Sequence, residues 1–325
     1  MAIWDAPAEI GILLYPGVAF ATVHGLTDLF TVSSTLARER MGPTAPMLRV
    51  SHWQPNPSVA SVDCVFDTHP NLARRPVAVI VPGSWGGQPD SAVTQCLVKW
   101  LVERHAAGTT LCSVCGGAFV LAETGLLAGR AATTHWTFIQ SLAERFPDIL
   151  VDECRITVED GNFITAGGVL AWADLGLKLV DRHLGPTIML ETARFMLMDP
   201  PGREQRFYSN FSPKLHHGDA EVLKLQHWLQ TEAANQPSLG EMAGVCGLST
   251  RTFLRRFKSA TGFNPTEYSQ RLRVGKAREM LEFTKRPINQ VALAVGYEDY
   301  GSFKKVFQKI VGLSPGDYRR RFTVA

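Results

Sequence analysis

The sequence has few cysteines and no long apolar run, and its first residues do not read as a targeting segment. Six cysteines are sparse for 325 residues, and no second Cys or His pair accompanies Cys112 and Cys115, as a zinc site would require. No stretch approaches the ~18 apolar residues that cross a bilayer, and residues 1–5 lack a basic segment before an apolar run. We therefore expect a cytoplasmic protein with no disulfides, metal, cofactor or membrane partner.

A strong net charge is also absent, with 33 Lys and Arg against 30 Asp and Glu, but this balance hides an asymmetry. Residues 214–325 contain 18 basic and 10 acidic residues, whereas the rest of the chain contains 15 basic and 20 acidic residues. The carboxyl-terminal region is therefore basic and the rest of the chain acidic, so only the carboxyl-terminal region is suited to contact phosphates. This asymmetry predicts nucleic-acid binding that weakens steeply with salt.

One sequence pattern occurs twice within residues 239–322. The matched positions lie 49 residues apart early in the unit and 50 apart later: Ala243 and Ala292, Gly247 and Gly296, Phe253 and Phe303, Phe257 and Phe307, Gly262 and Gly312, Pro265 and Pro315, Tyr268 and Tyr318. This change indicates one residue inserted in a turn. Each copy reads as a short helix ending at glycine, a tight turn and a second helix ending at glycine, the pattern of a helix-turn-helix.

The second helix of each copy has two faces. Phe253 and Phe257, like Phe303 and Phe307, have the i, i+4 spacing of an inward-packed face. The opposite face and the nearby helix start carry the residues placed to meet base edges and phosphates. These candidates are Arg251, Leu254, Arg255 and Lys258 in the first copy and Tyr300, Ser302, Lys304, Lys305 and Gln308 in the second.

A third helix begins after each second helix, where Asn264-Pro265 and Ser314-Pro315 form a cap followed by a proline. The first of these helices, expected over residues 265–283, would be ~28 Å long. Successive major-groove faces lie ~34 Å apart, so one chain has the reach to place both second helices in neighbouring turns of a duplex. The alternative interpretation is two helical hairpins whose charged residues are only solvated.

These residues resemble the AraC family of bacterial transcription regulators over about residues 219–322. The resemblance implies base-reading roles for Arg251, Leu254 and Arg255, and for Tyr300, Ser302, Lys304 and Lys305. Leu254 departs from the family pattern, in which a polar residue is commoner there, and would contact a thymine methyl group instead.

Residues 9–198 alternate between expected strands and helices, which favours an α/β fold with a mostly parallel sheet sandwiched by helices. The expected strands are residues 9–15, 48–51, 77–81, 109–114, 156–157 and 163–165. The expected helices are residues 22–40, 91–107, 117–123, 135–146, 170–184 and 187–198.

Cys115 stands where a buried strand runs straight into a helix. Glycines at 116 and 117 allow a sharp turn, and helix N–H groups would favour a thiolate, as in a nucleophile elbow. Cys112 is expected to be buried in the strand. The glycines at 83, 86, 87, 167 and 168 either offer N–H groups to a carboxylate or shape turns. Trp85 and Trp172 are candidates for lining a pocket.

The segments Val81-Pro82-Gly83-Ser84-Trp85-Gly86-Gly87, Thr133-Thr134-His135-Trp136 and Thr165-Ala166-Gly167-Gly168, together with the Cys115 turn, resemble the PfpI-type, flavodoxin-like domain of the class I glutamine amidotransferase-like superfamily. This domain followed by an AraC-type domain is the architecture of the GlxA-like regulators. The resemblance implies a sensory domain. Its expected ligand-binding residues are Thr22, Gly83, Trp85, Gly86, Cys115, Gly116, His135 and Gly167.

The residues themselves argue against catalysis. Thr22 stands where active relatives carry an acid, and Gly116 follows Cys115 where they carry histidine. His135 is expected to cap or pack a helix. The alternatives are a cysteine hydrolase or glyoxalase-like enzyme with Cys115 as nucleophile, or a redox sensor using Cys112 and Cys115.

We thus expect a ligand-sensing domain over residues 1–198, a linker over residues 199–218 and an all-α DNA-binding domain with two helix-turn-helix units over residues 219–325. The expected protein is a non-enzymatic transcription regulator, most simply an activator. Its expected partners are double-stranded DNA, RNA polymerase, a second copy of itself and a small effector such as an amino acid or amine.

Overall fold

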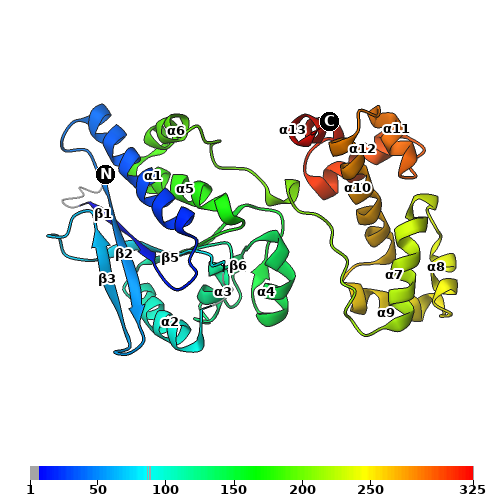
Figure 1. The fold of residues 1–325 in the computed structure, drawn as a ribbon, viewed down its shortest axis with the longest axis horizontal. Helices are drawn as coiled ribbons and strands as arrows, with labels where there is room; N and C mark the ends of the chain where they lie inside the picture. Colours follow the sequence, from blue (N-terminus) through cyan, green and yellow to red (C-terminus); the bar gives the residue numbers. More distant parts are fainter. Residues whose placement is uncertain (1–6, 86, 88, 325) are drawn as a thin grey trace. The chain divides into compact units, whose positions relative to one another are not determined.

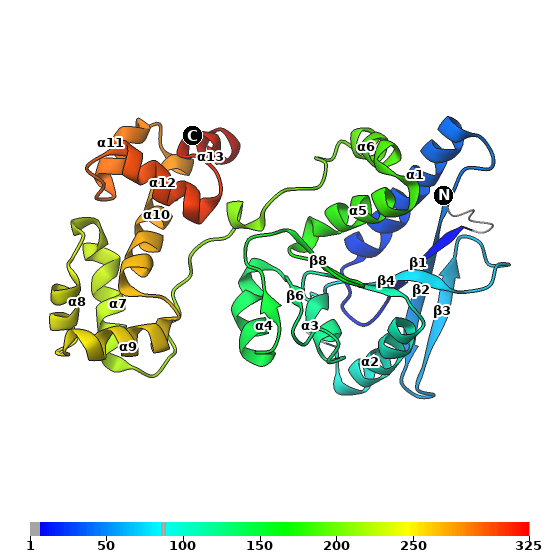
Figure 2. The same ribbon diagram turned by 180° about the vertical axis from the view of Figure 1, so that it is seen from behind.

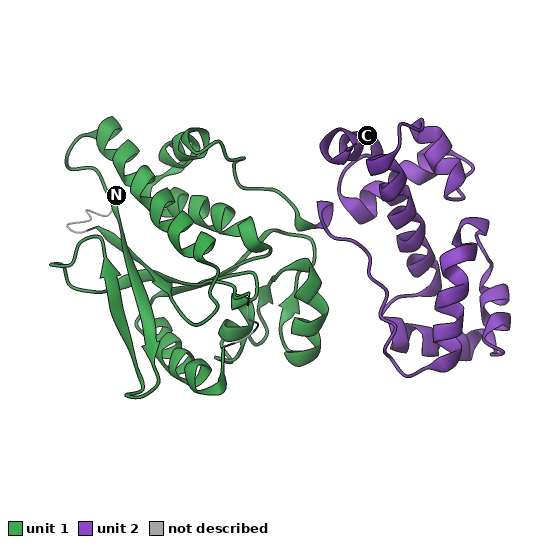
Figure 3. Cartoon of the chain, viewed as in Figure 1, with its two compact units in different colours: residues 1–205 green, residues 206–325 purple. Residues whose placement is uncertain are grey.

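The computed structural model describes residues 7–85, 87 and 89–324, which form two compact units, residues 1–205 and 206–325 (Figure 3). Within the described residues, no helix combines the length and apolar character needed to span a bilayer.

The first unit is built on a seven-stranded sheet of order β3-β2-β1-β4-β5-β9-β8. Its five inner strands run parallel, whereas the edge strands β3 and β8 pair antiparallel with their neighbours. The strands are β1 Ala8–Leu13, β2 Leu48–Asn56, β3 Ser61–Asp67, β4 Pro76–Val81, β5 Thr110–Val114, β8 Thr157–Asp160 and β9 Phe163–Ala166, with a separate pair of β6 Ala131–Ala132 and β7 Leu150–Val151.

Helices cover both faces of this sheet, as predicted for an α/β fold (Figures 1 and 2). Helices α1, α5 and α6 pack on one another over one face, and α2 and α3 pack together over the other. Their bounds are α1 Phe20–Met41, α2 Ser91–Ala106, α3 Gly117–Ala122, α4 Ile139–Arg145, α5 Trp172–Leu184 and α6 Pro186–Phe195. The inner strands β1, β4 and β5 are almost wholly buried, because parallel strands covered on both faces have no solvent side.

Several elements of the first unit differ from the expectation. The short strands β6 and β7 were not predicted, and β8 continues to Asp160, beyond the expected residues 156–157. The edge strand β3 was not predicted, because only Val62 among its residues is buried and its apolar pattern is weak. Pairing with β3 extends β2 to Asn56, well beyond the predicted end at Ser51. The helix predicted over residues 135–146 is divided into a 3₁₀ turn, Trp136–Phe138, and α4.

The second unit is helical: α7 Ala220–Glu232, α8 Leu239–Val245, α9 Thr250–Thr261, α10 Pro265–Phe283, α11 Ile288–Ala294, α12 Tyr300–Val311 and α13 Pro315–Phe322. It has two apolar cores, one around Phe253 and Phe257 and the other around Phe303 and Phe307. The long helix α10 contributes Tyr268 to the first core and Val274 to the second, so it joins the two helix-turn-helix units (Figure 1).

Helix α7 extends the repeat beyond what the sequence revealed. Its buried residues match the second half of α10 at an offset of 52: Val222 and Val274, Leu225 and Ala277, Leu229 and Leu281. Two features hid this match in the sequence. Its offset differs from that of the helix-turn-helix repeat, and most aligned positions of the two helices differ in residue identity. Each half of the repeat therefore consists of a framework helix, α7 or the second half of α10, followed by a helix-turn-helix.

Candidate nucleic-acid interface and effector pocket

Helices α9 and α12 present polar faces to solvent because their phenylalanines pack inward. Phe253, Phe257, Phe303 and Phe307 are fully buried. All nine residues predicted to contact DNA are exposed, at the following positions: Arg251, Leu254, Arg255 and Lys258 on α9, and Tyr300, Ser302, Lys304, Lys305 and Gln308 on α12. The predicted glycine ends are confirmed at Gly262 and Gly312, whose φ values are +80° and +86°.

The turns and caps of the two units also follow the sequence pattern. Gly247 and Gly296 have φ values of +62° and +84°, and the turn before α12 is one residue longer than the turn before α9. Asn264 accepts a hydrogen bond from Glu267 N (2.8 Å) and Ser314 one from Asp317 N (3.1 Å). The predicted insertion and both helix caps are therefore confirmed.

Two buried polar residues that sequence reasoning missed hold the segment before α7 against the helical unit. We call this segment, residues 206–217, the strap. Gln226 Nε2 donates to Tyr268 Oη (3.0 Å) and to the Lys214 carbonyl (3.0 Å). Arg278 Nε donates to Tyr318 Oη (2.8 Å), and its Nη2 donates to the Phe207 carbonyl (3.1 Å). The repeated tyrosines were the available signal, because a buried phenol needs a hydrogen-bond partner.

The first unit contains a sharp turn at Cys115, as the sequence predicts. Cys115 has φ +54° between β5 and α3, a left-handed conformation that is rare outside glycine. Neighbouring glycines make room for this turn: a Cβ on Gly83 would lie 3.0 Å from the Cys115 Cβ, and one on Gly117 only 2.2 Å from the Val81 carbonyl oxygen. The strand-to-helix elbow is thus enforced by backbone packing.

A cavity of about 120 Å³ opens beside the elbow. Its described lining residues come from α1, the β4 loop and the segments after β5, β6 and β9: Ala19, Thr22, Gly83, Ser84, Trp85, Cys115, His135, Thr137, Phe138 and Val169. No Asp, Glu, Lys or Arg is among them. The Thr22 hydroxyl is buried and has no hydrogen-bond partner among the described residues, so it is available to a ligand.

The electrostatics of the elbow differ from the expected stabilised thiolate. Burial raises the pKa of the Cys115 thiol, and this effect outweighs the opposing hydrogen bond from the Gly116 N–H. Burial likewise raises the pKa of the neighbouring Tyr15, whose hydroxyl donates to the Pro82 carbonyl. Cys115 is therefore a neutral thiol at pH 7, a poor nucleophile.

His135 caps the 3₁₀ turn that follows it, as predicted. Its Nδ1 accepts from the Thr137 N–H (3.2 Å) and contacts the Thr137 hydroxyl (2.7 Å). Burial lowers the pKa of the ring, so it is neutral at pH 7. A ring held in this way presents its remaining edge to the cavity as a polar but uncharged surface.

Comparison with known proteins agrees with both halves of this geometry. Residues 60–182 match the DJ-1/PfpI family and residues 242–321 match a helix-turn-helix domain family. The HTH-type transcriptional regulator CdhR of Pseudomonas aeruginosa is 30% identical over 236 residues, which cover 72% of this chain and 70% of CdhR. This chain belongs to the AraC-type transcription regulators that carry an amino-terminal DJ-1/PfpI domain.

Other relatives extend the match over both units. GlxA of Rhizobium meliloti, an HTH-type transcriptional regulator, is 25% identical over 317 residues and is covered to 96%, as is this chain. A transcriptional regulator structure from Vibrio parahaemolyticus aligns with 59% of this chain and 100% of its own, at 21% identity and a TM-score of 0.46. The match to a helix-turn-helix domain family and to the regulators CdhR and GlxA confirms the prediction of a DNA-binding regulator.

Of the four glycines expected to bind the ligand, only Gly83 is among the described residues that line the cavity. Gly167 does not line the cavity: its N–H already donates to the Ile156 carbonyl (2.7 Å), and a Cβ there would meet the Thr134 carbonyl oxygen at 2.7 Å. The expectation that it binds an anion is therefore corrected to close packing. Gly116 is not among the described residues that line the cavity. Gly86 lies outside the described residues.

Trp172 and Cys112 lie away from the cavity lining. Trp172 packs against α1, where a Cβ on Gly25 would approach its ring to 2.7 Å. Cys112 is fully buried within β5, as predicted, and burial raises its pKa to about 12. A thiol so protected from solvent and so hard to ionise is a poor partner for disulfide exchange.

Proposed function

We propose that this regulator contacts one operator through both α9 and α12 and responds to a small metabolite bound beside Cys115. The nine exposed residues on two matched helices support the DNA contact. The 19-residue helix α10 spans ~28 Å, close to the ~34 Å between successive major-groove faces. We further propose activation through RNA polymerase, a homodimer as the working form and action in the cytoplasm.

Gel-shift titration tests the DNA contact, using a duplex that the wild-type protein selects from a random-sequence pool. Arg255→Ala and Lys305→Ala should each weaken specific binding by about 1–3 kcal/mol, because each removes a cation that reaches a base edge or phosphate. Lys99→Ala, which removes a positive charge from an exposed position on α2 in the first unit, should bind as wild type. Unchanged specific binding by both Arg255→Ala and Lys305→Ala would refute the contact.

The chemistry of the cavity supports a small, compact effector. Its volume of about 120 Å³ is below the ~300 Å³ at which drug-sized sites begin. Trp85 and Phe138 offer aromatic faces, whereas Thr22 and His135 offer neutral polar groups. Amino acids, amines and betaines fit this combination, because an ammonium group binds aromatic faces without needing a carboxylate partner.

Thermal-shift measurements on the full chain with a panel of amino acids, betaines and amines test the cavity. Thr22→Val should keep or raise the melting temperature without ligand, since it removes a buried hydroxyl that lacks a partner. It should also abolish the stabilisation given by the best compound. Thr31→Val, on the exposed side of α1, is the matched control. Equal stabilisation of Thr22→Val and wild type would place the effector elsewhere.

We also propose that the cavity does not catalyse a reaction. The neutral Cys115 thiol, the capped His135 ring and the absence of a carboxylate from the described lining leave no general base for a nucleophile. The effector would instead favour one conformation of the regulator and so change its affinity for DNA.

A further inference from the structure

The last residues of the first unit are bound inside that unit, although they lie within the expected linker. We call this segment, residues 203–205, the latch. Arg203 Nε donates to the buried carboxylate of Asp174 on α5 (3.3 Å). Glu204 forms an antiparallel bridge with Arg155, in the segment before β8. The latch is therefore docked by both side-chain and backbone contacts.

Gln205 is the buried end of the latch. Its N–H donates to the Cys154 carbonyl (2.9 Å), and its Nε2 donates to Thr133 Oγ1 (2.8 Å) and to the Arg155 carbonyl (3.2 Å). Its Oε1 is buried as well, but has no hydrogen-bond partner among the described residues. A buried acceptor without a partner opposes docking, so the latch is held less tightly than its hydrogen bonds alone would suggest.

The side chain of Gln205 contacts a segment that also forms one wall of the cavity beside Cys115. Thr133 accepts the hydrogen bond from Gln205, and the next residue, Thr134, donates through Oγ1 to the Cys115 carbonyl (2.8 Å). The residue after that, His135, lines the cavity. Gln205 is thus two residues along the chain from a cavity contact.

A second wall of the cavity approaches the same side chain. A Cβ on Gly167 would lie 2.7 Å from Gln205 Oε1, so the backbone after β9 passes directly beside this amide. Val169, two residues farther on, lines the cavity. A ligand that fixes the positions of both walls therefore also fixes the surroundings of Gln205.

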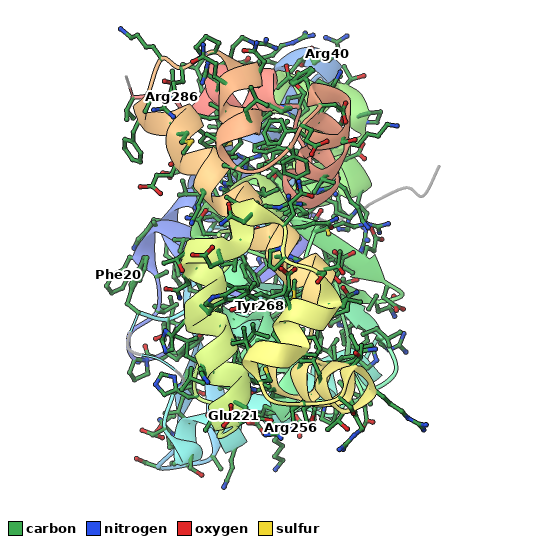
Figure 4. All side chains as sticks on the ribbon, turned by 90° about the vertical axis from the view of Figure 1, so that its right-hand side faces the viewer. Phe20, Arg40, Glu221, Arg256, Tyr268 and Arg286 are labelled. Carbon is green, nitrogen blue, oxygen red and sulfur yellow. The ribbon has the colours of Figure 1, made fainter. Side chains whose placement is uncertain are left out.

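The chain directly after the latch is held by the second unit. The Phe207 carbonyl accepts from Arg278 Nη2 (3.1 Å). Farther along the strap, Phe211 packs edge-on against Tyr268 on α10, with ring centroids 5.1 Å apart (Figure 4). While the latch is docked, only Arg206 separates a residue held by the first unit from a residue held by the second.

Release of the latch would lengthen this connection. On the amino-terminal side of the latch, the Met198 N–H donates to the Ala193 carbonyl (2.8 Å) at the end of α6. With the latch released, residues 199–206 would join the two units. An extended chain of this length spans up to roughly 26 Å at ~3.3 Å per residue. The state of the latch therefore sets the length of the connection.

We propose that Gln205 couples the cavity beside Cys115 to the connection between the two units. A small ammonium compound bound in the cavity orders both walls, keeps the latch docked and so keeps the connection short. The inference rests on the proposed effector site. Gln205 contacts neither the effector nor DNA and acts as a positioning residue. Connection length limits which placements of the DNA-binding unit can be reached, so docking of the latch changes affinity for the operator.

Trypsin cleavage of the native full chain measures release of the latch, because only an undocked segment enters the protease. Gln205→Ala should speed cleavage after Arg203 and Arg206 by about tenfold, since both side-chain hydrogen bonds of Gln205 are lost. Gln95→Ala removes the same amide from an exposed position on α2 and should be cleaved as wild type. Cleavage of each urea-unfolded variant corrects for intrinsic differences between the bonds.

Tetramethylammonium chloride is the probe for the cavity, with sodium chloride at the same concentration as the salt control. Its cation is small and suits the aromatic faces of Trp85 and Phe138. It should raise the melting temperatures of wild type and Gln205→Ala by similar amounts. It should slow cleavage of the wild type severalfold and change its affinity for the selected duplex, but do neither in Gln205→Ala. A residue that only stabilised the fold would not remove the response to a probe that still binds.

Equal cleavage rates for Gln205→Ala and wild type would overturn the proposal. So would a probe effect on cleavage that survives Gln205→Ala, or a wild type that the probe stabilises without any change in cleavage. If tetramethylammonium does not raise the melting temperature of the wild type, the effector class of the proposed function fails instead. The comparison of cleavage rates without the probe then still decides whether Gln205 holds the latch.

Discussion

Gly296→Ala should destabilise the helical unit by about 3–5 kcal/mol, because it combines two separate penalties. Gly296 has φ +84°, where alanine is strained by about 1–2 kcal/mol. Its Cβ would also lie 2.0 Å from the carbonyl oxygen of Ala234, in the connection between α7 and α8. Overpacking of this kind typically adds about 1–3 kcal/mol, and a rigid backbone atom leaves little room for relaxation.

The repeat supplies the matched control for this substitution. Gly247 is the equivalent residue of the first unit and has φ +62°, but a Cβ there meets no atom within 4 Å. Gly247→Ala should therefore cost only the conformational penalty, about 1–2 kcal/mol. Urea unfolding of the full chain, followed through the helical transition, measures both values. Equal losses would mean that the contact with Ala234 has no energetic weight.

The same contact has a consequence for DNA recognition. Ala234 belongs to the first helix-turn-helix unit and Gly296 to the second, and Arg273 Nη1 on α10 donates to the Gly296 carbonyl (3.2 Å). The close approach of Gly296 to Ala234 therefore limits how closely the two helix-turn-helix units pack against each other. Gly296→Ala should weaken binding to the selected duplex far more than Gly247→Ala does, even at a temperature where both variants remain folded.

Gly117→Ala is expected to destabilise the first unit by about 3 kcal/mol, the upper part of the range for overpacking. The added Cβ would lie 2.2 Å and 2.6 Å from the carbonyl oxygens of Val81 and Pro82, at the end of β4. These atoms belong to the central sheet, so the elbow must move away from them. Calorimetry of the full chain should show a lower transition temperature for the first unit, together with loss of the effector response.

The neighbouring glycine tests whether this effect is specific. Gly116 has φ −62°, and its nearest neighbour to an added Cβ is a Phe138 ring carbon at 3.9 Å, an ordinary contact. Gly116→Ala should therefore change stability by less than about 1 kcal/mol. Similar destabilisation by the two substitutions would show that close approach to β4 does not shape the elbow.

The parts of this regulator that could be predicted from sequence are those set by local pattern. Phe253 and Phe257 repeat as Phe303 and Phe307 at helical spacing, which identified the recognition helices and their exposed faces. The glycines around Cys115 identified the elbow in the same way. The anchoring of the strap could not be predicted, because Gln226 on α7 meets Tyr268 and the Lys214 carbonyl only in the folded helical unit.

The amino-acid sequence by itself determined the two helix-turn-helix units, their caps and the strand-to-helix turn at Cys115, because each depends on residues within a few positions of one another. Tertiary structure alone decided the ionisation of Cys115, the occupied N–H of Gly167 and the anchoring of the strap by Gln226 and Arg278. Burial and hydrogen-bond partners come from distant segments, and the free energy of a charge or polar group depends on them.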